Sequence, residues 1–566
     1  MSGSLAFGTK GIDVAIAETP AGQRAMSALQ PGTAPSTAVM HQSFTGALLR
    51  TVGGKLTEAP ISPFDILKTP FDGTDCTAWL TTLLSRGGDI WLPDGDYLIA
   101  SAGPDSGGVN VVLTKSTRIR CGSGARFFTN APGLDNDMIR FTVPPNGAGL
   151  PAKGIDFSWT GGVFDQAQQK GSTSMPFMAE FPSPNPGASS TCDGLSIRGD
   201  FKDLNGATWA GIRRCIVKDV VFDAGAHWQS AGGDGGLFIG GVRKARVEGN
   251  TFKGCRDVGF YASASDDGVV GGNYVVRNND FLHCFHGAAM KRGVLGFNIS
   301  DNYGEGCVRM VTIDYIVASA YGGSVRNNTG KKCHVLARVD QGRNITVQDN
   351  LSIEAGAFLA DGATPVAVMS PYIVVLQGAQ DCIVVHNNST GIHPTVAANY
   401  PTSGYAYAVS NAQDDATIKS QNNRLINNRA TGWRGLGVDQ GINTTMVDNE
   451  LIGGTVPQFL LGGSGQYEVR VNQATRRRDY SHGINLADGS PTNVALGRRG
   501  NDNHGIYWGT NLIGFAIAGT AQFIVDNRGV RLPGIATYPD DAAAQAGGLV
   551  PGNLYKTGDG TLHVVG

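Results

Sequence analysis

The peptide Val247-Glu248-Gly249-Asn250 is the first clear copy of the module that decides the fold: an aliphatic residue, two variable residues and an asparagine. The module returns at Val276-Arg277-Asn278-Asn279, Ile299-Ser300-Asp301-Asn302, Val325-Arg326-Asn327-Asn328, Val347-Gln348-Asp349-Asn350, Val385-His386-Asn387-Asn388, Leu425-Ile426-Asn427-Asn428 and Met446-Val447-Asp448-Asn449. Four of the asparagines are followed five positions later by cysteine, at Cys255, Cys284, Cys307 and Cys333. A period of about 20 to 40 residues is typical of a solenoid, in which no repeat buries its apolar face alone.

A second short apolar run follows each asparagine. The runs are Gly259–Ala262, Ala288–Met290, Val311–Ile313, Val335–Ala337 and Phe358–Ala360. Their length and their Gly, Asn and Asp neighbours favour strands over helices. We therefore predict a coil of strand, tight asparagine-bearing turn, strand and irregular loop. Asparagine suits such a turn because it tolerates a left-handed backbone, and stacked amides form ladders.

The predicted fold class is all-β: a right-handed parallel β-helix with Asn250, Asn279, Asn302, Asn328 and Asn350 stacked at one turn. The cysteine column favours small, inward-facing packing over a metal site, because the chain has no Cys-x-x-Cys pair. The nine cysteines are odd in number and scattered, which disfavours a disulfide framework and favours folding in a reducing cytosol.

Composition excludes several classes of function. The formal net charge is -2 and only 16% of residues are charged, so we expect no basic stripe for nucleic acid. No apolar run reaches membrane-spanning length, so we expect no membrane insertion. The first residues lack a basic segment followed by an apolar one, so we expect no secretory signal.

The entrance to the solenoid precedes the repeats. Residues 1–60 are rich in Ala, Gly, Ser, Thr and Pro. The apolar stripe at Trp79, Leu80, Leu83 and Leu84 predicts a short helix capped by Asp75 or Thr77 and stopped by Gly87-Gly88. The segment Asp89–Ile99 predicts strand, Pro-Asp-Gly turn, strand.

This entrance resembles that of bacteriophage tailspikes with a pectate-lyase-like parallel β-helix. The resemblance lies in Arg50-Thr51-Val52-Gly53-Gly54-Lys55-Leu56, in Phe71–Asp75, in the short helix and in Leu92-Pro93-Asp94-Gly95-Asp96-Tyr97. The chain departs from the family pattern at Phe71, where Gly is expected, and at Cys76, where a second Asp is expected. The helix and turn are shared with many bacterial carbohydrate-active β-helices, whereas residues 50–56 point towards phage tails.

The resemblance implies three regions: a virion-attachment segment at 1–60, the β-helix at 61–480, and a β-rich trimerisation or tip region at 481–566. It also implies a homotrimer that joins phage tail or baseplate proteins through its N-terminus. The implied location is the virion, with assembly in the host cytoplasm. The implied ligand is a glycan of host capsule or lipopolysaccharide, and no cofactor or metal is expected.

No nucleophile elbow, metalloprotease motif or phosphate loop occurs, so candidate sites follow from stacking the coils. Because strand side chains alternate, one register predicts an outward column that includes three carboxylates. The column is Ser263, Lys291, Asp314, Asp340 and Asp361, with Tyr261 and Arg338 beside it. A one-residue register shift would instead turn each Asp inward.

Neighbouring carboxylates in this column would lie about 5 Å apart, the separation of retaining glycosidases, while Asp314 and Asp361 would approach the inverting range of about 6.5–9.5 Å. In this prediction the Asp residues are catalytic, Tyr261 offers a stacking face to a sugar, and Lys291 or Arg338 binds an acidic substituent. The alternative is an exposed ladder balanced by Lys291 and Arg338 that contributes little.

A second candidate cluster is Asp266-Asp267-Gly268 with His283 and His286, in which Asp266 and Asp267 are catalytic and His286 binds substrate, although a turn explains Asp-Asp-Gly equally well. The predicted function is a tailspike that binds and cleaves a host surface polysaccharide, with glycoside hydrolysis favoured over elimination. A non-catalytic receptor-binding tail protein and a bacterial polysaccharide lyase remain alternatives, because fold does not imply function.

Overall fold

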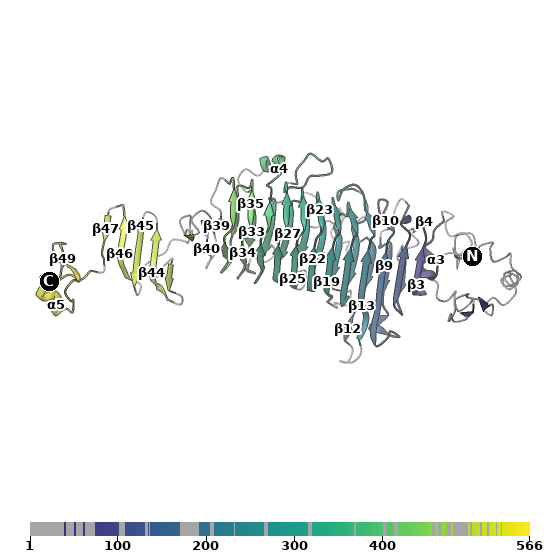
Figure 1. Cartoon of the computed structure of the whole chain (residues 1–566), viewed down its shortest axis with the longest axis horizontal. Coiled ribbons are helices and arrows are strands. Elements are labelled where there is room, and N and C mark those ends of the chain that lie inside the picture. Colours follow the sequence, from purple (N-terminus) through teal and green to yellow (C-terminus); the bar gives the residue numbers. More distant parts are fainter. Residues whose placement is uncertain are drawn as a thin grey trace, which may run out of the picture.

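Three long parallel sheets run along the molecule and form an extended rod (Figure 1). This computed structural model describes residues 39–40, 50–51, 60–62 and 74–566, with gaps at 101–107, 131–133, 135, 170–191, 204–208, 231, 265–269, 315–319, 367–369, 400–403, 413–416, 455–458, 462–466, 470, 473–476, 479–495, 499–500, 510–511, 518–519, 528 and 534. Most of the predicted attachment segment and all of the Pro/Ser-rich run 175–188 therefore lie outside the described residues.

Along the chain, each coil contributes one strand to the first sheet, then one to the second sheet and then one to the third sheet. The first sheet holds β3 (Gly88–Leu92), β6 (Thr117–Cys121), β9 (Lys153–Thr160), β13 (Trp209–Lys218), β16 (Lys244–Glu248), β19 (Gly272–Arg277), β22 (Leu295–Ser300), β25 (Tyr321–Arg326), β28 (Arg343–Gln348), β31 (Ile383–Val385), β34 (Arg424–Ile426), β37 (Thr445–Val447) and β40 (Tyr467–Val469), with β12 (Lys202–Asp203) paired to β13.

The second sheet holds β4 (Gly95–Leu98), β7 (Ala125–Phe128), β10 (Val163–Asp165), β14 (Val221–Asp223), β17 (Thr251–Lys253), β20 (Asp280–Leu282), β23 (Tyr303–Glu305), β26 (Thr329–Lys331), β29 (Leu351–Ile353), β32 (Asn388–Ser389), β35 (Arg429–Thr431) and β38 (Glu450–Ile452). The third sheet holds β5 (Val109–Val112), β8 (Ile139–Thr142), β11 (Asp193–Arg198), β15 (Gly235–Gly240), β18 (Val258–Ser263), β21 (His286–Met290), β24 (Arg309–Ile313), β27 (Val335–Asp340), β30 (Tyr372–Gln377), β33 (Tyr405–Ser410), β36 (Gly435–Asp439) and β39 (Phe459–Leu461).

The fold is thus the predicted right-handed parallel β-helix, with one difference in the coil. The sequence pattern predicted two strands per coil, whereas the structure has three. The missed strands belong to the second sheet and lie inside the Asn-to-Cys interval, as β17 does between Asn250 and Cys255. Most of them are only three residues long, so each has a single inward side chain and no visible alternation.

The predicted asparagine ladder is confirmed and is longer than expected. Asn302 Oδ1 accepts hydrogen bonds from Asn279 N at 3.0 Å and Asn279 Nδ2 at 2.9 Å. Asn302 Nδ2 in turn donates to Asn328 Oδ1 at 2.9 Å and to the Val276 carbonyl at 3.0 Å. The same bonds link Asn250, Asn279, Asn302, Asn328, Asn350, Asn387, Asn428 and Asn449.

Two details of this turn differ from expectation. In the sixth copy the ladder residue is Asn387, whereas Asn388 begins β32 and is exposed, because Val384, not Val385, pairs with Val347. The left-handed residue is the one before each ladder asparagine, which explains Gly, Asn, Asp or His there. These residues are Gly249, Asn278, Asp301, Asn327, Asp349, His386, Asn427 and Asp448.

The core is a column of inward side chains from successive coils. Phenyl rings stack from Phe127 through Phe164, Phe222 and Phe252 to Phe281, with ring centroids 5.0–5.1 Å apart. The predicted cysteine column, Cys255, Cys284, Cys307 and Cys333, is buried in the same core as packing. Burial raises the pKa of the Cys284, Cys307 and Cys333 thiols well above the usual value, so these thiols stay protonated.

The two ends of the rod carry smaller elements. The predicted helix is α3 (Thr77–Ser85), and Asp75 Oδ1 accepts from Thr77 N at 2.9 Å at its start. Beyond the coils lie a five-stranded antiparallel sheet and a small terminal hairpin with α5 (Asp541–Ala546) (Figure 1). The remaining elements are β1 (Val39–Met40), β2 (Arg50–Thr51), a short 3-10 helix at Pro145–Gly147, α4 (Pro394–Asn399), β41 (Val471–Asn472), β42 (Arg477–Arg478), β43 (Leu496–Arg498), β44 (Asn501–Gly509), β45 (Leu512–Ile517), β46 (Thr520–Asp526), β47 (Gly529–Arg531), β48 (Leu554–Lys556) and β49 (Leu562–Val564).

Candidate functional site

Four members of the predicted column do lie side by side at the ends of neighbouring strands of the third sheet. The register pairs Ala262 with Met290, Met290 with Ile313, and Ile313 with Val339. The residues that follow are therefore neighbours in successive coils: Ser263, Lys291, Asp314 and Asp340.

The fifth member, Asp361, does not belong to the column, and that prediction is wrong. Residues 354–371 form an insertion between β29 and β30, in which Phe358 bridges Pro365 instead of starting a sheet strand. Asp361 lies in its exposed turn, where Oδ1 accepts from Ala363 N at 2.9 Å and Thr364 N at 2.8 Å. Gln377 pairs with Asp340 instead, so no carboxylate lies two coils beyond Asp314 in this column.

The column is also buried, which differs from the exposed ladder that the sequence allowed. The side chains of Lys291, Asp314, Arg338 and Asp340 are 3%, 13%, 8% and 12% exposed. Lys291 Nζ lies 3.9 Å from Asp314 Oδ2, and Arg338 Nε donates to both oxygens of Asp340 at 2.9 and 2.7 Å. Buried ion pairs are expensive to form and to break, so this cluster is a recessed charged site.

Burial shifts the pKa values of three groups in this charged cluster. Desolvation raises the pKa of Asp340. The charge of Arg338 opposes this shift, and the charge of neighbouring Asp314 adds to it. Desolvation, with the positive charges of Arg309, Lys291 and Arg338, lowers the pKa of His286 well below its usual value. Desolvation and the charge of Arg338 lower the pKa of Arg309 to about 10. Burial thus makes the neutral forms of Asp340 and His286 more favourable than they are in water.

Tyr261 and His286 are placed in this site, but not as predicted. Tyr261 is only 8% exposed: its ring packs edge-on to Phe238 at 5.3 Å, and Lys291 Nζ lies 5.2 Å from the ring centroid. Protein groups therefore already cover the face that was predicted to stack on a sugar. His286 is buried and its Nε2 lies 3.3 Å from Arg309 Nη1.

The second candidate cluster stays a prediction, because Asp266 and Asp267 lie outside the described residues. His283 has a positive φ of 51° in the turn after β20, and its ring lies 5.7 Å from that of His227.

A set of carboxylates was missed from the sequence. They lie at or just before the starts of strands β8, β11, β15 and β18 of the third sheet: Asp137, Asp193 and Asp234, which are buried, and Asp257, which is half-buried. Asp193 N donates to Asp137 Oδ1 at 3.1 Å, and Arg140 Nε donates to Asp137 Oδ2 at 2.8 Å. Desolvation and the charge of Asp137 raise the pKa of Asp193 well above its usual value.

A sequence signal could have found part of this set. In successive coils the residue two positions after the column cysteine is Asp257, then His286, then Arg309. His286 and Arg309 are paired in register, and Asp257 directly precedes Val258, the residue that pairs with His286, so this spacing marks a polar region at the starts of these strands.

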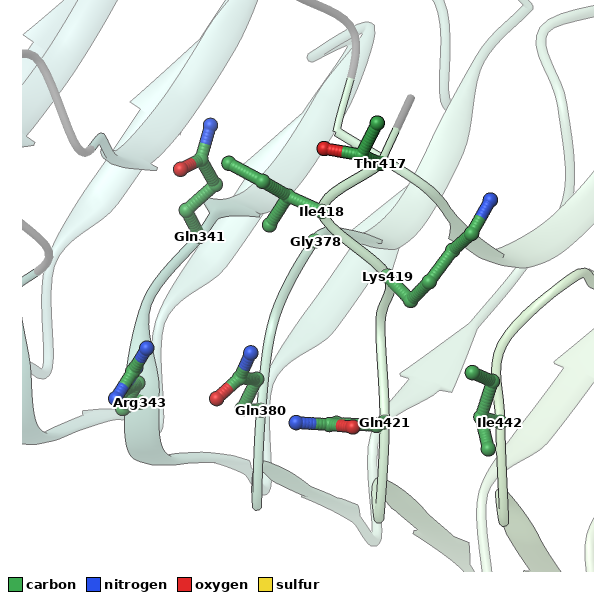
Figure 2. Close-up of a pocket in the computed structure, with 9 residues that line it drawn as sticks. All are labelled: Gln341, Arg343, Gly378, Gln380, Thr417, Ile418, Lys419, Gln421 and Ile442. Atoms are coloured by element: carbon green, nitrogen blue, oxygen red, sulfur yellow. The ribbon is translucent and has the colours of Figure 1, made fainter. Parts of the chain in front are cut away.

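A polar pocket adjoins the column on the side of the later coils. Its volume is about 330 Å³, and Figure 2 shows the amides of Gln341, Gln380 and Gln421 along it, with Arg343 and Lys419. Gln341 directly follows Asp340 in the chain, and Gly378, also in the lining, directly follows Gln377. Amide and amino donors in a pocket of this size suit a polar ligand such as a sugar unit.

Among the described residues, no group of three or more His, Cys, Asp and Glu side chains is placed to hold a metal ion. No helix in the described ranges is long and apolar enough to cross a membrane.

The strand pairing defines a protein of the parallel β-helix class. No protein-family model and no curated protein sequence matches the chain. Solved structures do resemble it, and they include a phage tailspike. A mutant tailspike protein of Escherichia coli bacteriophage HK620, in complex with a hexasaccharide, is 12% identical, with 79% of this chain and 86% of that chain covered and a TM-score of 0.43.

Two further similar structures have other descriptions. The pre-mature bacteriophage phi29 gene product 12 is 14% identical, with 78% of this chain and 60% of that chain covered and a TM-score of 0.48. The A-module of the Azotobacter vinelandii mannuronan C-5 epimerase AlgE4 is 15% identical, with 72% of this chain and 99% of that chain covered and a TM-score of 0.45. These likenesses are distant, and the strand register of the chain itself carries the fold assignment.

Proposed function

We propose that this protein is a phage tailspike that binds and cleaves a polysaccharide of the host surface. The observation that carries the proposal is the pair Asp314 and Asp340, on adjacent strands within a recessed charged cluster that adjoins a polar pocket. Glycan cleavage needs two carboxyl groups in different environments, and this pair meets that requirement.

The proposed reaction is glycoside hydrolysis with retention of configuration. Adjacent strands are about 4.8 Å apart, close to the separation of about 5 Å that retaining enzymes use. Asp340, whose pKa burial raises, donates its proton to the leaving oxygen. Asp314, which faces the Lys291 ammonium, attacks the anomeric carbon, and water then releases the sugar. An inverting mechanism would need a second carboxylate two coils away from Asp314, and Gln377 stands where that carboxylate was expected.

The pocket at Gln341 supplies the proposed binding surface for a neighbouring sugar unit. Its amides offer donors and acceptors to hydroxyl groups, and its position next to Asp340 keeps the chain of sugars near the reacting bond.

For assembly, we propose a parallel homotrimer attached to phage tail or baseplate proteins through residues 1–60 and assembled in the host cytoplasm before it joins the virion. The division into attachment segment, β-helix at 61–480 and trimerisation region at 481–566 is part of this proposal. It is supported by an apolar face on β45, where Ile513, Phe515 and Ile517 are 54%, 44% and 57% exposed.

The test is incubation of the full-length protein with purified capsular polysaccharides and lipopolysaccharides, followed by assays for reducing ends and for ultraviolet absorbance. New reducing ends without absorbance support hydrolysis, whereas an unsaturated product identifies a lyase. Binding without any product identifies a receptor-binding protein. If the protein neither binds nor cleaves any of these polymers, the proposal is overturned.

Variants locate the site on a substrate that the parent protein cleaves. Asp314→Asn and Asp340→Asn should each reduce cleavage at least about a hundredfold, the usual effect of losing a general acid, base or nucleophile. If both variants keep full activity, this site is wrong, and Asp266 and Asp267 are the next carboxylates to change.

A further inference from the structure

The charged cluster contains hydrogen-bond donors that lack partners among the described residues. On the three neighbouring strands β18, β21 and β24, four buried polar atoms have no hydrogen-bond partner in the described part of the chain: Ser263 Oγ, His286 Nδ1, Arg309 Nε and Thr312 Oγ1. Buried polar groups are nearly always paired, so a set of unpaired atoms on neighbouring strands requires an explanation.

The protonation state of His286 determines whether its Nδ1 atom is a hydrogen-bond donor or an acceptor. An arginine can only donate, so His286 Nε2 accepts from Arg309 Nη1 at 3.3 Å. Burial and the surrounding cations keep the ring neutral, since they lower its pKa well below the usual value. Nδ1 therefore carries the hydrogen, and it is an unpaired donor.

Among the described residues, Arg309 lacks a directly bonded counter-ion. Asp314 faces Lys291 and Asp340 is bonded to Arg338, whereas the side-chain hydrogen-bond partner of Arg309 in this part of the chain is the neutral ring of His286. Asp257 is near enough to act on Arg309 electrostatically but forms no ion pair with it among the described residues.

An anion satisfies both deficits. It gives Arg309 a directly bonded counter-ion, and its oxygens accept from the unpaired N–H and O–H groups. Water could fill the hydrogen bonds but would leave Arg309 without a bonded counter-ion, and Arg309 would repel a cation. Arg309 is 8% exposed, so the residue keeps a narrow opening to solvent.

We infer that Arg309 and His286, together with Thr312, form a subsite for the carboxylate of an acidic sugar in the glycan. The inference rests on the proposed function and names its substrate class: a polysaccharide that contains uronate or another acidic sugar. Arg309 begins β24 and Asp314 directly follows that strand, about 16 Å further along the chain direction, so the acidic sugar lies within a few sugar units of the cleaved bond.

The decisive comparison uses an acidic capsular polysaccharide and the same polymer after chemical reduction of its carboxyl groups to alcohols. The parent protein should bind the acidic polymer and lose at least about tenfold in affinity for the reduced one, the effect of one lost charge-assisted contact. Equal binding or equal cleavage of the two polymers overturns the subsite while leaving the proposed function standing.

Small anions test the subsite without any polymer. Sodium glucuronate should raise the thermal unfolding temperature of the parent protein relative to glucose with matched sodium chloride, because a ligand of the folded state stabilises it. Sodium sulfate in a parallel arm distinguishes a general oxyanion site from one that requires a carboxylate. No shift with glucuronate overturns the inference, even if no cleaved polymer is found.

Variants assign the effect to named side chains. Arg309→Gln should abolish the glucuronate shift, and His286→Asn should reduce it. Arg120→Gln on β6 should leave it unchanged, because Arg120 is exposed on the first sheet. If Arg309→Gln does not fold, Arg309→Lys keeps the charge but loses the planar fork, and it should keep only part of the shift. A full shift in the folded Arg309 variants contradicts the assignment.

Discussion

Arg338 Nε donates to both carboxylate oxygens of Asp340, at 2.9 and 2.7 Å, and both side chains are almost completely buried. Asp340 thus has two proposed tasks, one in each protonation state: as a carboxylate it neutralises a buried guanidinium, and once protonated it donates that proton to the leaving group. The two tasks make different predictions for stability and for catalysis.

Asp340→Asn should lose at least about a hundredfold in cleavage. It should also lower the free energy of unfolding by about 3 kcal/mol, because the variant leaves the Arg338 charge buried without its counter-ion. Urea denaturation and initial cleavage rates measure the two effects separately. Asp361→Asn is the matched control, since Asp361 lies in an exposed turn, and it should keep full activity. Normal stability of Asp340→Asn would contradict the buried ion pair.

The buried Asp193 predicts a dependence of stability on pH. Its pKa in the folded protein is raised well above the usual value of 3.8, so folding favours the protonated form. This contribution to stability is complete below pH 3.8 and is lost as the pH rises through the folded pKa, at about 1.4 kcal/mol per pH unit. Asp193→Asn cannot ionise and should be more stable than the parent at pH 7, with the difference shrinking towards pH 4. Urea midpoints across this range measure it, and parallel curves would contradict the prediction.

The asparagine ladder predicts a sharp difference between neighbouring asparagines. Asn387→Ala removes hydrogen bonds to Asn350 and Asn428 in the buried ladder and should destabilise the protein by about 2–3 kcal/mol. Asn388→Ala alters an exposed side chain and should change stability by less than about 0.5 kcal/mol. Denaturant midpoints of the two variants decide which residue is in the ladder. Equal effects would contradict the pairing of Val384 with Val347, which places Asn387 in the ladder.

The apolar face of β45 predicts the oligomeric state. Phe515→Asp places a charge among Ile513, Ile517 and Val525, which is 40% exposed on the paired strand β46. If this face joins three copies, light scattering should change from a trimer for the parent to a smaller species for the variant. A parent protein that is already a stable monomer would refute the trimer. A trimer that survives the substitution would place the contact elsewhere.

The stacking of successive coils could be predicted well from the sequence, and the strands within each coil less well. The fixed spacing from Asn279 to Cys284 was enough to predict coils, ladder and inward thiols, because each pair recurs at one place in the structure. The three-residue strand between them was not predicted, since one buried side chain such as Phe281 gives no periodic signal. Local spacing also misplaced the sixth ladder residue by one position.

The site was predicted in part for a similar reason. The alternation of strand side chains placed Lys291, Asp314 and Asp340 correctly, because these coils lack an insertion between the second and third sheets. It failed at Asp361, where residues 354–371 intervene. Burial of the cluster and the raised pKa of Asp193 depend on segments distant in the chain, so no local pattern could have indicated them.

The asparagine turn is two residues long in every coil from 249–250 to 448–449. The other two corners of the coil accept insertions such as 354–371 and 411–423. One edge of the rod is therefore fixed by its hydrogen bonds, and the other two edges can gain or lose whole loops without disturbing it. If the proposed function holds, a lineage carrying this protein could recombine those loops to meet a new host coat while inheriting the same shaft, and an engineer could exchange them in the same way.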